Sequence, residues 1–207
     1  MGTEGFYGRL MESAGEGGER FDTHVAASIL ALGMEEARRE GTTLSARLGL
    51  DAAALRRMAA TLFPGAQDML AGFVLEEALA VDAEEQSVRD VLWMSAAAAT
   101  GFERDLACMV ARRCLRPNHL WQDLGLRNRG ELSRLMREHF PVLAQRNRND
   151  MKWKKFLYRT ICASEGFSLC AAPVCTECDD FAACFGAEDG DPLVARMRRD
   201  NAAPAPP

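Results

Sequence analysis

Apolar residues recur every three or four positions along most of the chain, a spacing that places them on one face of an α-helix. Val25 and Ile29 belong to the first such series, which follows Asp22, a residue that can cap a helix, and precedes Gly41, which can end one. The same spacing predicts further helices over about 43–49, 51–62, 66–80, 85–98, 101–115 and 150–160. The pattern therefore predicts an all-α protein, a multi-helix bundle.

One stretch of this pattern occurs twice. Leu-x3-Leu-Gly-Leu, followed by Leu-x2-Met/Leu-x4-Phe-Pro, spans residues 44–64 and again 120–141. The repeat predicts two related helical units, each with a short helix, a glycine turn and a longer helix. A DNA-binding helix-turn-helix is the alternative for the first unit, but that unit lies in the acidic half of the chain, and such turns are common between helices.

The composition agrees with helices and divides the chain into four segments. Hydrophobic residues make up 48% of the 207 residues and aromatic residues only 7%, a mixture with high helix propensity. We expect a flexible N-terminus over 1–20, a helical domain over 21–160, a Cys-rich segment over 161–187 and a disordered tail over 188–207. Neither a membrane span nor a signal peptide is expected, which favours a cytoplasmic location.

The net charge of −5 conceals a strong segregation of charge along the chain. Residues 1–111 carry 9 Lys/Arg against 18 Asp/Glu, residues 112–159 carry 13 against 4, and residues 160–207 carry 3 against 8. A basic block directly before a cluster of thiolates can offset their negative charge or attract an anion. The alternative is an ordinary solvated helical face.

Four cysteines near the C-terminus have the spacing C-x4-C-x2-C-x5-C. They are Cys170, Cys175, Cys178 and Cys184. Thiolates at such spacing can converge on one thiophilic centre, which means zinc, Cu(I) or an iron–sulfur cluster. Buried free thiols and disulfides are the alternatives, but the loops between the cysteines are too short to bury a core and nothing indicates export.

Zinc is the main alternative to an iron–sulfur cluster. Structural zinc sites often use two Cys-x2-4-Cys pairs, whereas this chain has one Cys-x2-Cys pair flanked by single cysteines, which is more typical of a cuboidal cluster. With zinc, the chain would be a metal-stabilised interaction module. A helical DNA-repair glycosylase also ends in a four-cysteine loop, but its first gap is six residues, and its glycine-rich hairpin motif has no counterpart here.

Three motifs together resemble the NifQ family. They are Arg116-Pro-Asn-His-Leu-Trp-Gln-Asp-Leu-Gly-Leu126, Asp150-Met-Lys-Trp-Lys-Lys-Phe-Leu-Tyr-Arg159, and the four cysteines followed by Phe-Gly. The resemblance covers about residues 85–186 and is strongest from Pro117 onward. It implies a non-enzymatic cytoplasmic protein that carries an iron–sulfur cluster containing molybdenum on Cys170, Cys175, Cys178 and Cys184.

The resemblance also implies a role and partners. Members of the family supply molybdenum, taken up as molybdate, to the NifEN scaffold complex together with the NifH iron protein, for assembly of the nitrogenase iron–molybdenum cofactor. Neither nucleic acid nor a membrane is an expected partner.

Other residues near the cysteines are weaker candidates. Cys162 and His119 are accessory candidates as metal ligands, although helix packing for the cysteine and capping for the histidine are the alternatives. The candidates for contact with molybdate or a partner are Lys152, Lys154, Lys155 and Arg159. Cys108 and Cys114 lie in an apolar-rich stretch, which favours a structural role.

Overall fold

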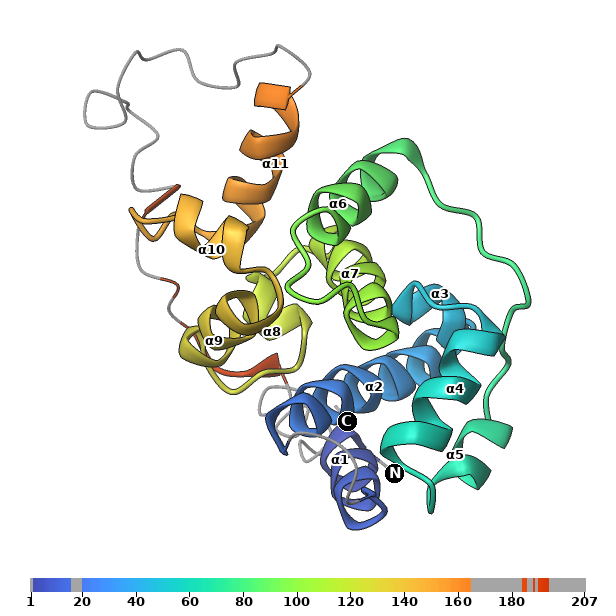
Figure 1. The fold of residues 1–207 in the computed structure, drawn as a ribbon. Helices are drawn as coiled ribbons and strands as arrows, with labels where there is room; N and C mark the ends of the chain where they lie inside the picture. The colour runs from blue at the N-terminus through green and yellow to red at the C-terminus, as the bar shows by residue number, and fades with distance from the viewer. Residues whose placement is uncertain (1, 16–19, 165–183, 186–187, 189, 194–207) are drawn as a thin grey trace, which may run out of the picture.

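The computed structural model describes residues 2–15, 20–164, 184–185, 188 and 190–193 (Figure 1). Over these residues the chain forms eleven helices and no strand, which confirms the all-α prediction. The helices are α1 (Thr3–Glu12), α2 (Arg20–Glu40), α3 (Leu44–Leu48), α4 (Ala52–Leu62), α5 (Gln67–Ala71), α6 (Ala83–Trp93), α7 (Gly101–Cys114), α8 (Leu120–Asp123), α9 (Arg129–His139), α10 (Pro141–Arg146) and α11 (Trp153–Ser164). None of the described helices is long and apolar enough to cross a bilayer.

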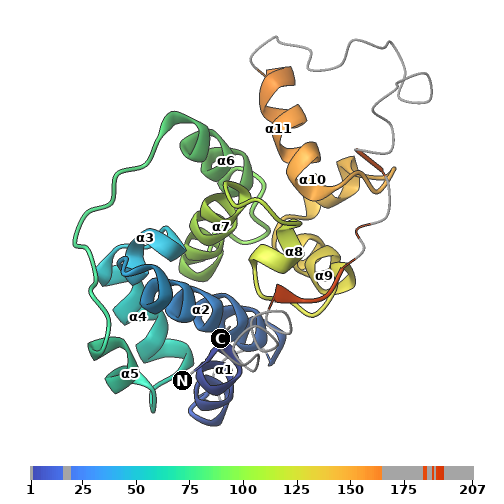
Figure 2. The same cartoon turned by 180° about the vertical axis from the view of Figure 1, so that it is seen from behind.

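Helix α2 is the element around which the others pack. Val25, Ile29 and Leu32 are fully buried, as their spacing predicts, and α2 contacts both α1 and α3. The helix begins at Arg20, so Asp22 lies in its first turn instead of capping it. Two opposite views place α10 and α11 at the far end of the molecule from α4 and α5 (Figure 1, Figure 2).

The N-terminal residues differ from the prediction of a flexible segment, because residues 3–12 form α1. Phe6 and Leu10 of this helix are buried in the core, and Phe6 stacks edge-on against Phe73 at 5.9 Å between ring centroids. Burial of two large apolar side chains outweighs the local cost of the glycines in this segment.

The two repeated stretches have the same local backbone geometry. Gly49 and Gly125 both have φ = +70°, the left-handed conformation that ends a short helix, and Phe63 and Phe140 have nearly equal φ and ψ values at the end of the longer helix. The repeated apolar positions are buried in both units: Leu44, Leu48, Leu50, Leu55, Met58 and Phe63 in one, and Leu120, Leu124, Leu126, Leu132, Leu135 and Phe140 in the other. The prediction of two related helical units is therefore consistent with the structure.

The predicted helix over 66–80 is wrong, because α5 ends at Ala71. Backbone carbonyls of the following segment accept hydrogen bonds from the first turns of two other helices. The carbonyls of Val74 and Glu76 accept hydrogen bonds from the N–H groups of Leu44 and Ala52, at the starts of α3 and α4. A helix start leaves such N–H groups without intrahelical partners. The connecting segment therefore holds two helix N-termini in place, a role that requires its own backbone to be non-helical.

Two histidine–carboxylate bridges join α2 to α9. His24 of α2 lies 3.2 Å from Glu131, and His139 of α9 lies 2.9 Å from Asp22. Glu103, the capping-box residue of α7, lies 3.7 Å from the other ring nitrogen of His139. These contacts connect the N-terminal helices with the second helical unit.

We expect the bridge at His139 to give the protein a pH-dependent stability. Burial lowers the pKa of this imidazole, but the hydrogen bond to Asp22 and the charges of Asp22, Glu103 and Glu138 raise it above its usual value. The stabilisation is therefore complete below about pH 6.5 and is lost as pH rises through the folded-state pKa. Urea unfolding across a pH series should show wild type and His139→Gln converging in stability toward alkaline pH. A constant difference would show that protonation is not involved.

Candidate metal-cluster segment

We call residues 165–185 the cysteine segment. It begins at the C-terminal end of α11 and ends beside the N-terminal end of the same helix. Cys170, Cys175 and Cys178 lie outside the described residues, whereas Cys184 is described. The carbonyl of Cys184 accepts a 2.8 Å hydrogen bond from the N–H of Lys152, one residue before α11 begins. Since α11 has twelve residues, residues 165–183 connect two points separated by about 18 Å along the helix.

The end of the segment is fixed to the helical domain by its last two residues. Cys184 is a half-buried free thiol, and both Cys184 and Phe185 pack against the hydrophobic core. One of the four predicted ligands is therefore held at a defined position next to the start of α11. The other three stay predictions.

Residues after Cys184 return to α8 and α9. Glu188 is nearly buried, lies 2.8 Å from a guanidinium nitrogen of Arg129 and 3.8 Å from Nδ1 of His119. The side-chain amide of Gln122 donates a 2.8 Å hydrogen bond to the carbonyl of Asp191. These contacts anchor the residues that follow the segment. The imidazole of His119 therefore faces the carboxylate of Glu188. At the start of α8, the side-chain oxygen of Gln122 accepts a hydrogen bond from the backbone N–H of His119.

Asp123 is the centre of a polar network that joins the first two motifs. Its buried carboxylate lies 2.6 Å from Nζ of Lys154 and accepts a 3.0 Å hydrogen bond from the amide of Asn118. The same ammonium donates to the carbonyl of Arg116, and the guanidinium of the fully buried Arg113 donates to the carbonyl of Asp123. The network fixes α11 against α7 and α8, and thereby fixes the point where the cysteine segment begins.

The structure separates the four basic candidates that precede the segment. Lys154 is committed to the ion pair with Asp123, which leaves it 18% exposed and unsuited to collecting an anion. Lys155 and Arg159 are exposed on α11 and Lys152 is half-buried beside it. The predicted contacts of Lys155 and Arg159 with molybdate or a partner stay predictions, whereas Lys154 is already paired with Asp123.

The remaining cysteines have the environments of core residues or of an accessory position. Burial raises the pKa of the Cys108 thiol and raises that of Cys114 to about 12, so both are held as thiols. Since the thiolate is the metal-binding form, their environments favour the structural role predicted for them. Cys162 is a half-buried free thiol in the last turn of α11, close in sequence to the segment.

Folding neutralises part of the basic block, which sequence alone did not predict. Four of its arginines pair with acids outside the block: Arg112 with Glu85, Arg113 with Glu36, Arg116 with Glu36 and Glu40, and Arg129 with Glu188. Three of these acids lie in the acidic N-terminal half. Most of the block's cations near α7 therefore serve internal ion pairs.

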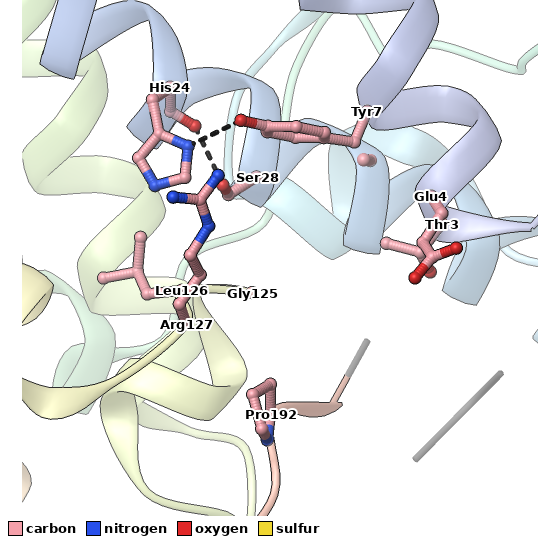
Figure 3. Close-up of a pocket in the computed structure, with 10 residues that line it drawn as sticks. Thr3, Glu4, Tyr7, His24, Ser28, Gly125, Leu126, Arg127 and Pro192 are labelled. Atoms are coloured by element: carbon pink, nitrogen blue, oxygen red, sulfur yellow. Dashed lines mark hydrogen bonds between the residues drawn. The ribbon is translucent and has the colours of Figure 1, made fainter. Parts of the chain in front are cut away.

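The sequence did not predict a cavity that the structure contains near the start of α9. It has a volume of about 250 Å³ and lies between α1, α2 and the turn after α8, with Tyr7, His24 and Arg127 at its wall (Figure 3). Tyr7 and His24 share a 2.9 Å hydrogen bond across it. No spacing rule reveals this cavity, because its walls come from α1, α2 and the turn after α8, which are far apart in the sequence.

Comparison with known proteins decides the family. The NifQ family model matches residues 25–186, which include both polar motifs and all four cysteines. The chain belongs to the NifQ family. In the structure the three motifs of this chain meet, since Asp123 of the first binds Lys154 of the second and Cys184 lies beside the second.

Individual NifQ relatives agree with this assignment. The chain is 39% identical to a NifQ homolog of Sinorhizobium fredii over 83% of its own length and 74% of the relative's. It is 40% identical to NifQ of Rhodobacter capsulatus over 76% and 86% of the two chains, and 46% identical to NifQ of Azotobacter vinelandii over 40% and 43%. No solved structure matches the chain.

Proposed function

We propose that this protein holds molybdenum as part of a molybdenum–iron–sulfur cluster and donates it for assembly of the nitrogenase iron–molybdenum cofactor. The cluster is cargo, and the protein is its carrier, not an enzyme. Molybdate is the source of the metal, and the NifEN scaffold complex and the NifH iron protein are the proposed partners, in the cytoplasm. Membership of the NifQ family supports each of these assignments.

The observation that carries the proposal is the way the thiolate segment is attached. The carbonyl of Cys184 accepts a hydrogen bond from the N–H of Lys152. The other end of the segment follows α11, and the Asp123–Lys154 ion pair holds this helix in place. The sequence supplies four soft donors within one short stretch, and the last of them, Cys184, packs against the helical domain. Such donors fit an iron–sulfur cluster, and Cys170, Cys175, Cys178 and Cys184 would hold it.

The same attachment suits release of the cargo. Cysteines on one short segment can exchange with the ligands of a partner while the helical domain stays folded, because that domain has its own large buried side chains, Phe63 and Phe140 among them. Exposed Lys155 and Arg159 lie on α11, the helix that joins the two ends of the segment, and can bind an oxyanion through charge-assisted hydrogen bonds.

The decisive experiment is metal analysis of protein purified without air, followed by transfer. We expect iron, sulfide and, after incubation with molybdate, molybdenum, together with the brown colour of an iron–sulfur protein. Mixing the loaded protein with NifEN and NifH should move molybdenum to the scaffold. A colourless protein containing zinc alone would reject the proposal in favour of a zinc-stabilised interaction module.

A further inference from the structure

A second surface of the protein, formed by α1, α2 and α9, carries several cationic side chains. An open groove of about 730 Å³ runs between α1, the start of α2 and α9. Four arginines line it, and we call it the arginine groove: Arg20, Arg127, Arg134 and Arg137. All four residues are exposed to solvent.

The helical domain neutralises the arginine groove only in part, since Arg127 lies 3.8 Å from Glu131 and Arg134 lies 2.7 Å from Glu138. Glu131 is the single carboxylate among its lining residues, and it is already bound by His24 and by the backbone N–H of Arg127. Neither Arg20 nor Arg137 has an acidic partner within the part of the chain that the structure describes. The arginines near α7, in contrast, are paired with Glu36, Glu40 or Glu85.

Contacts within the protein hold two side chains of the groove in place before any ligand arrives. The guanidinium of Arg134 lies 3.9 Å from the ring centroid of Phe21, and its Nε donates a 2.7 Å hydrogen bond to Glu138. Tyr7 is oriented by its hydrogen bond to His24. Immobilised arginine and tyrosine side chains lose little entropy on binding, and both are enriched where proteins meet.

The cavity of Figure 3 extends the groove inward. It shares Tyr7, His24 and Arg127 with the groove. Leu126 and Pro192 give it an apolar wall, and Glu4 also lines it. Its volume of about 250 Å³ accommodates one large apolar side chain. The groove thus combines a cationic rim with an apolar recess, which is the arrangement of a protein-docking site.

The exposure of the four arginines indicates whether the groove binds a small anion or a protein segment. They come from three places, the start of α2, the turn after α8 and successive turns of α9, and each faces water. Exposed pairs with one small ion are weak, whereas several such pairs along one acidic chain add together. We propose that the arginine groove docks an acidic segment of a partner protein, with one apolar side chain of that segment in the recess. This proposal is independent of the metal cargo.

The proposal is tested with full-length protein and a fluorescein-labelled glutamate-rich peptide that contains one central leucine. We expect the double variant Arg20→Gln, Arg137→Gln to bind the peptide about tenfold more weakly at low salt. The matched control is Arg39→Gln, Arg56→Gln, which removes two exposed arginines outside the groove and should change affinity less than about twofold. Circular dichroism verifies that both variants are folded.

Two further arms complete the test. A peptide with serine in place of leucine should bind wild type several-fold more weakly, because the recess is then unfilled. Equal losses in the two double variants, or no effect of the leucine, would overturn the proposal. It would also be overturned if molybdate or sulfate alone bound at the groove arginines and displaced the peptide at low concentration, which would show a small-anion site. No arm requires bound metal, so the result does not depend on the proposed carrier function.

Discussion

Replacing Cys178 by Ala should abolish cluster binding and leave the helices intact. The segment supplies four thiolates to the cluster and contains no fifth cysteine that could replace a lost one. We therefore expect the variant to lose most of its iron. Iron and sulfide content of anaerobically reconstituted protein, measured together with far-UV circular dichroism, checks both parts. The same result is expected for Cys170, Cys175 and Cys184.

The helical signal should persist because the described core has many large buried side chains that belong to the helical domain. Its largest buried side chains, among them Phe63, Phe140 and Met109, all precede α11. Cys162→Ala is the matched control, a neighbouring thiol on α11 whose removal should leave the iron content unchanged. Equal loss of iron in that variant would make Cys162 a primary ligand, and loss of most helical signal in the Cys178 variant would show that metal organises the whole protein.

Hydrophobic periodicity predicted the helices wherever each helix buries its own apolar stripe. It also predicted helices that begin at about residues 43 and 51, where the side chains of Thr43 and Asp51 accept hydrogen bonds from the N–H groups of Ala46 and Ala54. It failed for residues 72–80, which have helix-forming residues but bond to the N-termini of α3 and α4. It failed for α1 because Phe6 gains its stability from contacts with a distant part of the chain, including Phe73.

For the candidate site too, features set by neighbouring residues were predictable from the sequence, and features set by distant residues were not. Ligand spacing and motif resemblance are properties of adjacent residues, so the sequence predicted the cysteine segment and the family. Ion pairing is not local: Arg113 meets Glu36 across 77 positions, and Lys154 meets Asp123 across 31. A count of charges along the chain therefore overstated the cationic surface near α11 and missed the arginine groove.

Lys154 and Lys155 are adjacent residues with opposite expected roles, which makes them a sharp test of the network that supports the segment. Lys154→Met leaves the carboxylate of Asp123, which is 2% exposed, with Asn118 as its remaining side-chain partner. Removing one member of a buried ion pair costs about 3 to 5 kcal/mol. Because Lys154 is itself 18% exposed, we expect a loss near the lower end, about 3 kcal/mol, in urea unfolding.

The exposed neighbour supplies the control. Lys155→Met should change the free energy of unfolding by less than about 0.5 kcal/mol, since the side chain leaves no buried charge behind. Adding Asp123→Asn to Lys154→Met should recover part of the loss, because the unpaired buried charge is then removed. Reconstituted iron should fall in Lys154→Met and not in Lys155→Met, since the pair fixes the helix from which the cysteine segment departs. Equal stability of the two single variants would show that the Asp123–Lys154 pair does not hold α11 in place.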